Sequence, residues 1–225
     1  MKLTVLYEDN HLLIVEKPVN MPVQEDDSKD LDLLNLGKQY LVEKYNKPGE
    51  AFLGLVHRLD RPVGGAILFA KTSKAASRVS NEIRLNRLDR VYYTVVRGLP
   101  RENKATLTDF LLKDTKKNIT SVVDQSNKQA KKAILDFEVI ARNKREDLSL
   151  LKVKLHTGRS HQIRVQLAHM GHPIYGDQKY GRHVNKVGQQ IALWAYQLGV
   201  KHPTKDEIIT VTCDSPNEYP WNLFK

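Results

Sequence analysis

Cysteine is almost absent from this chain of 225 residues, because Cys213 is the only one. A single cysteine excludes an internal disulfide framework and a metal site built from several thiolates. So little cysteine is typical of a reducing compartment. No apolar run approaches the length needed to cross a bilayer, and the first residues do not resemble a signal peptide. We therefore expect a cytoplasmic protein that does not enter a membrane.

Several signatures of cofactor and nucleophile chemistry are also missing. The sequence contains no glycine-rich dinucleotide fingerprint, no phosphate-loop signature and no Gly-x-Ser-x-Gly elbow. Four histidines lie between residues 156 and 172, but they lack the i, i+4 spacing with an intervening glutamate that a helical zinc site uses. Solvated or capping roles explain these histidines better. We expect neither a metal nor a cofactor.

Positive charge is abundant and unevenly distributed. The formal net charge is +10, yet residues 1–36 hold eight acids against three lysines, a net of −5, so the rest carries +15. This asymmetry indicates a polyanionic partner, such as nucleic acid, for the later part of the chain. No segment combines a basic face with a strongly apolar one, which argues against a membrane surface.

The order of the expected elements predicts one domain over residues 1–225. Strands are expected at 3–8, 11–16, 90–98, 105–112, 119–124, 133–142, 148–155 and 208–212. Helices are expected from a cap at Asp30 to about Tyr45, after a cap at Thr72 or Ser73, and from a cap at Ser160 to Gly171. Residues 191–198 fit either a helix or a strand. Because strands follow one another without helices between them, we expect an α+β fold, a mainly antiparallel mixed sheet with flanking helices.

The stretch around Asp60 combines charge with apolar flanks. Apolar runs at 51–55 and 66–70 predict a buried β-hairpin that carries Arg58, Asp60 and Arg61 at its tip. Arg58 lies two residues before Asp60, so alternation along a strand would put both side chains on one face. Taken alone, the segment is better explained as an ordinary turn, because Asp and Pro favour such positions for backbone reasons.

Two distant segments change that interpretation. The expected strand 90–98 carries Tyr92, whose ring would offer a stacking platform for a base. His161 and Arg164 lie three residues apart, so both project from one side of the expected helix. A guanidinium lowers the pKa of a nearby carboxyl by about 1–3, which offsets the rise of about 3–5 that full burial causes. These residues favour nucleic-acid chemistry on a single carboxylate without identifying a reaction.

Lysines concentrate between two of the expected strands. Residues 113–132 hold six lysines, including Lys116 and Lys117, against two aspartates. A solvated hairpin and an RNA contact explain such lysines equally well.

Three motifs together resemble the RluA-type family of RNA pseudouridine synthases. They are His57-Arg58-Leu59-Asp60, the Tyr92 strand, and the segment Thr157–Arg164, in the family's order and spacing. The likeness runs from Leu6–Asp9 and Glu16-Lys17-Pro18 to Lys201-His202-Pro203, nearly the whole chain. It implies the pseudouridine synthase fold and an isomerase that converts specific uridines of structured ribosomal or transfer RNA to pseudouridine without a cofactor.

The resemblance also implies roles for individual residues. Asp60 matches the catalytic aspartate, Tyr92 the tyrosine that packs on the target base, and Arg164 the arginine that pairs with the aspartate. Arg58 matches the arginine that enters the RNA stack as the uridine swings out. The expected RNA-binding residues are His57, Arg58, Arg61, Arg159, His161, Gln162, Leu193, Lys116 and Lys117, with Leu193 as an apolar residue of the pocket.

The chain departs from the family pattern at a few positions. Val63-Gly64-Gly65 replaces a common Thr-Ser-Gly, Trp194 stands where a histidine is common, and Arg90 and Thr94 flank Tyr92 in place of Lys and Ala. None of these changes replaces a residue matched to the catalytic set. We expect an active enzyme with an altered preference among RNAs.

Two other functions would also fit parts of this sequence. One is a catalytically idle RNA-binding or ribosome-assembly factor with the same fold, against which the intact catalytic set argues. The other is a nucleosidase or glycosidase, but these generally use two carboxylates, and Asp60 has no clear partner carboxylate in the sequence. We expect no separate N-terminal RNA-binding module of the kind that some relatives carry, and we expect target choice to rest on the catalytic domain, acting as a monomer.

Overall fold

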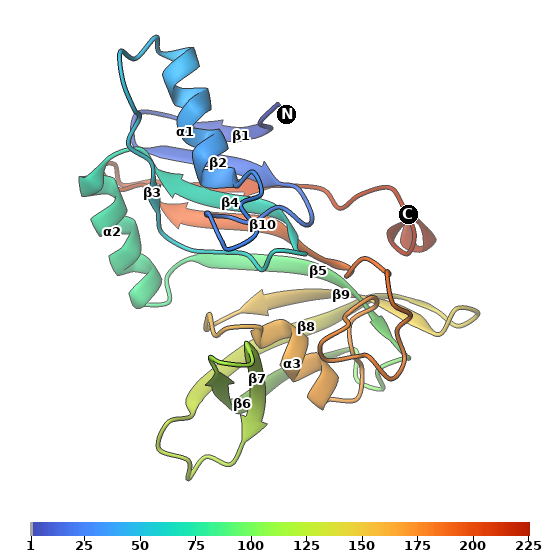
Figure 1. Cartoon of the computed structure of the whole chain (residues 1–225). Coiled ribbons are helices and arrows are strands. Elements are labelled where there is room, and N and C mark those ends of the chain that lie inside the picture. Colours follow the sequence, from blue (N-terminus) through green and yellow to red (C-terminus); the bar gives the residue numbers. More distant parts are fainter. Residues whose placement is uncertain (1) are drawn as a thin grey trace. The chain divides into compact units, whose positions relative to one another are not determined.

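The computed structural model describes residues 2–225. The chain separates into two compact units (Figure 1). The first consists of Met1–Arg90 with Ala195–Asp214, and the second of Val91–Trp194 with Ser215–Lys225. Among the helices of residues 2–225, none is long and apolar enough to span a bilayer.

The first unit is a sheet with two helices. Its strands are β1 (Val5–Glu8), β2 (Leu12–Lys17), β3 (Gly54–Leu55), β4 (Gly64–Ala70), β10 (Leu193–Lys201, mostly in this unit) and β11 (Ile208–Thr212). They follow the order β1-β2-β4-β10, with β3 paired to β4 and β11 to β10. The helices are α1 (Leu33–Lys44), which lies across β1 and β2 in Figure 1, and α2 (Ser73–Arg84), next to β3.

Strand β4 is the centre of this unit's core. All seven of its residues are buried, and β2 pairs with it antiparallel, from Leu12 opposite Ala70 to Lys17 opposite Gly65. An uninterrupted apolar run suits a strand covered on both faces. Gly37 of α1 lets that helix approach Leu53, the residue before β3, because a Cβ there would stand 2.7 Å from the Leu53 side chain.

The second unit is a five-stranded sheet with one α-helix. Its strands are β5 (Asp89–Arg97, mostly in this unit), β6 (Lys104–Asp114), β7 (Ile119–Val123), β8 (Lys131–Asn143) and β9 (Leu148–Leu155). They lie in the order β5-β9-β8-β6-β7, and each neighbouring pair is antiparallel. Helix α3 (Gln162–His169) packs on this sheet through Val165, which meets Leu111 and Ala133, and a short 3₁₀ helix follows at Trp221–Phe224.

The predicted α+β class and the antiparallel strand series are confirmed, and two helix starts are wrong. Asp32, not Asp30, caps α1, because its Oδ1 accepts the Asn35 N–H at 3.0 Å. Helix α3 begins after His161, which has φ +54° and makes no side-chain cap, so Ser160 is not the cap. The predicted cap of α2 at Thr72 is correct, and the segment near 191–198 is the strand β10.

The predicted hairpin around Asp60 is present in shortened form. Strand β3 has only two residues, which pair with Phe69 and Ala70 of β4, and residues 56–63 form a loop. Arg58 and Asp60 therefore do not lie on a strand. The argument from strand alternation, which put both on one face, is wrong.

Gly65 has a backbone conformation that only glycine adopts easily, with φ +112°. A Cβ at this position would stand 2.4 Å from the carbonyl oxygen of Ala195 in β10. We predict that Gly65→Ala lowers the free energy of unfolding by more than the ~1–2 kcal/mol cost of a left-handed conformation, because backbone atoms must also move apart. Urea unfolding measures this change.

The matched control is Gly49→Ala, where a Cβ would meet nothing within 4 Å. Equal stability of the two variants would show that the close approach of Gly65 to β10 does not constrain the loop that precedes β4.

Candidate active site

The loop that carries Asp60 is closed by a turn. The Val63 N–H donates to the carbonyl oxygen of Asp60 at 2.9 Å, and Leu59 and Val63 are buried on either side. Asp60 itself is partly exposed and Arg58 is exposed. The loop thus presents a carboxylate from an anchored backbone, which is what a catalytic carboxylate requires.

The side chain of Lys17 is fully buried and binds the backbone of this loop. Its Nζ donates to the carbonyl oxygens of Pro18 at 2.9 Å, Met21 at 2.7 Å and Arg61 at 2.9 Å. Burial lowers the pKa of Lys17 to about 7, against the attraction of the Asp60 carboxylate, which raises it. The ammonium therefore connects the backbone after β2 to the residue that follows Asp60.

His57 and Arg61 are both engaged within the first unit. The Nε2 of His57 accepts the Leu68 N–H at 3.0 Å, and burial, helped by the charge of Arg90, lowers the pKa of His57 to about 3. A ring that is neutral at pH 7 offers no charge to a phosphate. Arg61 donates to Asp26 at 3.3 Å, to Ser28 at 3.0 Å and to Asp30, so its guanidinium lies on the acidic loop.

Arg164 forms a buried bidentate ion pair in the second unit. Its Nε donates to Oδ2 of Asp177 at 2.8 Å and its Nη2 to Oδ1 at 2.9 Å. Asp177 is only 1% exposed. Burial alone raises the pKa of Asp177, but the Arg164 hydrogen bonds and charge, with the N–H groups of Lys179 and Tyr180, lower it below its ordinary value. The sequence predicted Asp60 as the carboxylate partner of Arg164, which stays a prediction, and missed Asp177.

His161 and Tyr180 extend this arrangement. The hydroxyl oxygen of Tyr180 lies 2.7 Å from Nδ1 of His161, and the guanidinium carbon of Arg164 lies 5.4 Å from the centre of the Tyr180 ring. A guanidinium at that distance over an aromatic face is attracted to it. Tyr180 therefore contacts His161, which precedes α3, and Arg164, which lies within it.

Gln162 and Arg159 mainly serve the loop before α3. Gln162 is 3% exposed; its Oε1 accepts from the Thr157 hydroxyl at 2.8 Å and the Arg159 N–H at 2.9 Å, and its Nε2 donates to Ile134 at 3.1 Å. Gln162 therefore positions the loop, and its expected RNA contact stays a prediction. Arg159 is exposed and its Nε donates to the Lys132 carbonyl at 2.9 Å, so an RNA contact by its remaining N–H groups stays a prediction.

The other predicted residues are placed as follows. Tyr92, on β5 opposite Val153, and Leu193, at the start of β10, are both buried. Lys116 and Lys117 are exposed in the turn between β6 and β7. Within residues 2–225 the ammonium groups of these two lysines make no ion pair, so they are available to phosphates.

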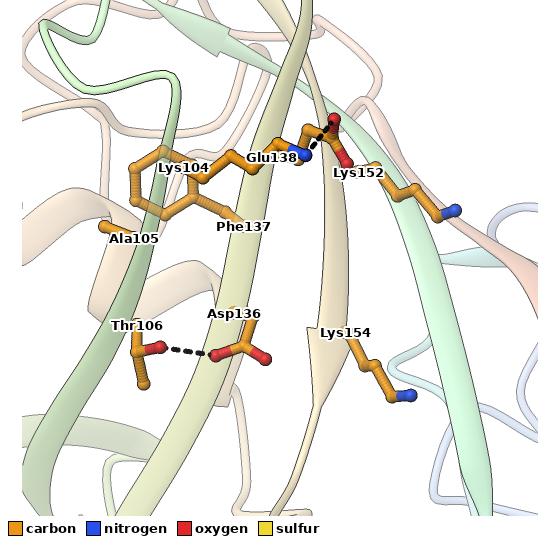
Figure 2. A pocket seen from close by; sticks show the side chains of 8 residues that line it. All are labelled: Lys104, Ala105, Thr106, Asp136, Phe137, Glu138, Lys152 and Lys154. Atoms are coloured by element: carbon orange, nitrogen blue, oxygen red, sulfur yellow. Dashed lines mark hydrogen bonds and ion pairs between the residues drawn. The ribbon is translucent and has the colours of Figure 1, made fainter.

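A pocket of about 520 Å³ lies on the sheet of the second unit (Figure 2). Its carboxylates are already bound: Lys104 Nζ lies 2.9 Å from Glu138, and Thr106 donates to Asp136 at 2.7 Å. Lys152 and Lys154 of β9 line the pocket, and they flank Val153, which is paired with Tyr92. Side chains alternate between the two faces of a strand, so these lysines lie on the other face from Val153 and Tyr92. The pocket therefore lies on the face opposite Tyr92, and we do not place the chemistry there.

The predicted site residues fall into two sets. The first unit brings together His57, Arg58, Asp60 and Arg61, and the second holds Tyr92, Arg159, His161, Gln162, Arg164, Leu193, Lys116 and Lys117. The meeting of the two sets stays a prediction. No group of three or more His, Cys, Asp or Glu side chains within residues 2–225 is arranged to hold a metal ion.

Three residues that hold the side chains of these sets in place were not identified from the sequence. Lys17 stands in Glu16-Lys17-Pro18, and Asp177 and Tyr180 stand in Gly176-Asp177-Gln178-Lys179-Tyr180-Gly181. A lysine within an apolar strand and an aspartate after a turn glycine are visible in the sequence. Their partners, 44 residues away for Lys17 and 13 for Asp177, are set by the fold.

Comparison with known proteins gives a consistent result. The family model for RNA pseudouridylate synthase matches residues 11–169, a range that contains Asp60, Tyr92 and Arg164. The uncharacterized RNA pseudouridine synthase YhcT of Bacillus subtilis is 35% identical over 217 residues, which cover 96% of this chain and 69% of that protein. Ribosomal large subunit pseudouridine synthase C of Buchnera aphidicola (from Acyrthosiphon pisum) is 34% identical over 180 residues, 79% of this chain and 54% of that protein.

Solved structures agree on the fold. Human RNA Pseudouridylate Synthase Domain Containing 4 superposes with a TM-score of 0.79 at 20% identity, covering 95% of this chain and 88% of that one. Human RNA Pseudouridylate Synthase Domain Containing 1 gives 0.75 at 24%, covering 96% and 84%. The chain therefore has the pseudouridine synthase fold that its motifs predicted.

The buried ammonium of Lys17 predicts a pH-dependent stability. Between about pH 7 and the ordinary lysine pKa of 10.5 the unfolded chain binds a proton that the folded chain has lost. The stability of the native protein therefore rises with pH in this window, by at most about 1.4 kcal/mol per pH unit from this group. Lys17→Met removes this slope and leaves three carbonyl oxygens without their donor, at a cost of about 1–3 kcal/mol each where buried.

Urea unfolding from pH 6 to 9.5 measures both effects, with the exposed Lys74→Met as control. We expect the gap between native protein and Lys17→Met to widen above pH 7, and no such widening for Lys74→Met. A gap that stays constant with pH would contradict the lowered pKa of Lys17.

Removal of the Asp177 charge leaves Arg164 buried without its carboxylate. We predict that Asp177→Asn lowers the free energy of unfolding at pH 7 by about 3–5 kcal/mol, the usual cost of breaking a buried pair. The pKa of Asp177 is lowered, so its contribution is present above the unfolded pKa and lost as the pH falls through the folded one. The deficit of the variant should therefore shrink below about pH 4.

The control for this substitution is Asp206→Asn, because Asp206 pairs with Lys201 on the surface with its side chain 96% exposed. Such a pair contributes about 0–1 kcal/mol. Similar stability losses in both variants would mean that the Arg164–Asp177 pair does not hold the second unit together.

Proposed function

Because this chain belongs to the RNA pseudouridylate synthase family, we propose that it isomerises specific uridines in structured RNA to pseudouridine, with Asp60 as the catalytic carboxylate. One observation carries the proposal: a single family match, over residues 11–169, contains Asp60, Tyr92 and Arg164 together. The anchored loop of Asp60 and the buried pair of Arg164 are the kind of support that a reacting group needs.

The reaction conserves all atoms of the nucleoside. The bond between N1 of uracil and C1′ of ribose breaks, the base turns, and C5 bonds to C1′ in its place. The hydrogen of C5 leaves to solvent and N1 takes up a proton, so no cofactor or energy source is consumed. The detached base must stay in place while water is kept out, which favours an apolar and aromatic pocket.

In the proposal, the residues of the two sets provide the reacting carboxylate and the apolar and aromatic pocket. Asp60 acts on the target nucleotide, Tyr92 packs on its base, and Leu193 contributes apolar surface. Arg164 pairs with Asp60 and keeps it ionised, while Asp177 holds the guanidinium from its other side. Arg58, exposed on the Asp60 loop, fills the vacancy left in the RNA stack and so recovers part of the few kcal/mol that base extrusion costs.

Phosphate contacts fall to the exposed lysines of the second unit. Lys116 and Lys117, in the turn between β6 and β7, neutralise backbone phosphates, which makes RNA binding salt-dependent. Relatives named ribosomal large subunit pseudouridine synthase C make ribosomal RNA the first target to test, with transfer RNA as the second. We further propose that the chain works as one catalytic domain and as a monomer in the cytoplasm.

An idle RNA-binding factor with the same fold is the alternative. It would keep the lysines, the basic surface and the structural Arg164–Asp177 pair but would have no need of Asp60. Measurement of turnover, as distinct from binding, separates the two functions.

We predict that Asp60→Asn abolishes pseudouridine formation, with a loss of at least about 10³-fold in rate, and leaves RNA affinity largely unchanged. Amide and carboxylate have nearly the same shape, so the loop should fold unchanged. Single-turnover rates on ribosomal and transfer RNA transcripts, with affinities measured in parallel, provide the test. Asp27→Asn, in the exposed acidic loop of the same unit, is the control; a substantial rate with Asp60→Asn would remove Asp60 from the mechanism.

A further inference from the structure

Tyr180 lies where three parts of the second unit meet, and neither the sequence motifs nor the proposed mechanism assigns it a role. Its ring packs against the cluster of Leu111, Ala133 and Val165, which joins strands β6 and β8 to helix α3. Its main-chain N–H donates to Oδ1 of Asp177 at 3.1 Å. The side chain is partly buried. Both the backbone and the ring of Tyr180 are thus fixed before its hydroxyl makes any bond.

The hydroxyl of Tyr180 connects the β6–β7 hairpin to the start of α3. It accepts the backbone N–H of Thr120, in β7, at 2.9 Å, and it lies 2.7 Å from Nδ1 of His161. Strand β7 stands at the end of its sheet, so the Thr120 N–H is bonded to a side chain where a sheet edge would leave it to solvent. A second tie runs beside it, from Lys179 Nζ to the Asn118 carbonyl at 2.8 Å.

The ring of Tyr180 faces Arg164. The guanidinium carbon lies 5.4 Å from the ring centre, while the N–H groups on one side of the guanidinium bind Asp177. Ion pair and ring together restrict the plane in which the guanidinium can lie. The rings of His161 and Tyr180 also meet edge to face, with centroids 5.7 Å apart.

We propose that Tyr180 is a positioning residue: its hydroxyl holds His161 to the backbone of the lysine-bearing hairpin while its ring orients Arg164. The orientation of two side chains expected in the active site thereby depends on the hairpin whose turn carries Lys117, three residues before Thr120. The inference rests on the proposed function, because it concerns the rate of the same reaction.

The test is Tyr180→Phe, which removes the hydroxyl and keeps the ring. A typical net hydrogen-bond contribution corresponds to a change of about two- to tenfold in rate. We therefore expect kcat for pseudouridine formation to fall about two- to tenfold, with KM for RNA within twofold. The ¹⁵N chemical shift of His161 Nδ1 should move in the same variant, which shows directly that the ring has lost its partner.

Tyr175→Phe is the matched control from the same unit. The Tyr175 hydroxyl accepts from Gln189 at 2.7 Å, and its ring lies 4.5 Å from the guanidinium carbon of Arg97, so it loses the same kind of bond beside the same kind of cation. Its kcat and KM should equal those of the native protein. Equal losses of kcat in Tyr175→Phe and Tyr180→Phe would assign both to general stability and overturn the proposal.

A second variant, His161→Phe, removes the other end of the bond. If His161 acts through Tyr180, the double variant should be no slower than the slower single one, whereas independent residues would multiply their effects. Multiplied effects, or a Tyr180→Phe enzyme with native kcat, would overturn the proposal. If Tyr180→Phe does not fold, a fall in kcat at constant KM for His161→Phe supports the proposal, and native kcat overturns it. A native protein that forms no pseudouridine would instead refute the proposed function, so the two failures are distinguishable.

Discussion

Arg164 and Asp177 are both withdrawn from water, and each stays charged there because it binds the other. Much of the second unit is arranged around this pair. The loop after α3 returns to place Asp177 opposite the helix, and the Lys179 and Tyr180 N–H groups complete the carboxylate's bonds. The pair makes a flexible arginine into a fixed one, which an active site that must stabilise a specific carboxylate requires.

The first unit uses a buried charge for a related purpose. Lys17 does not meet a carboxylate; its Nζ binds three carbonyl oxygens and thereby joins the segment after β2 to Arg61 in the Asp60 turn. The pKa of Lys17 is lowered to about 7 because burial costs more than the nearby Asp60 charge returns. In the proposed mechanism, the buried lysine that binds the backbone of the Asp60 loop and the arginine that Asp177 fixes support one aspartate by two separate means.

The parts of the fold that follow from local pattern were predictable. The apolar run of β4, the antiparallel series β6 to β9 and the Thr72 cap each have a signal within a few residues. Ser160 resembled a cap in the sequence, but the chain turns at His161, with φ +54°, a conformation that non-glycine residues rarely adopt.

For the candidate site, the motifs located Asp60, Tyr92 and Arg164 by resemblance, whereas their supports depend on contacts between distant segments. No sequence pattern links Lys17 to Arg61 or Tyr180 to Thr120, because the sheets bring these residues together. The burial of Gln162 was not predictable for the same reason, since it is a property of the folded loop.

The central claim is that uridine is isomerised and not hydrolysed or merely bound. RNA transcripts that carry tritium at C5 of uridine test it directly, because formation of the carbon–carbon bond must expel that hydrogen. The account predicts that the purified protein releases tritium to water in step with pseudouridine formation, with no free uracil. Release of free uracil, or stable RNA binding without tritium release from any ribosomal or transfer RNA, would contradict it.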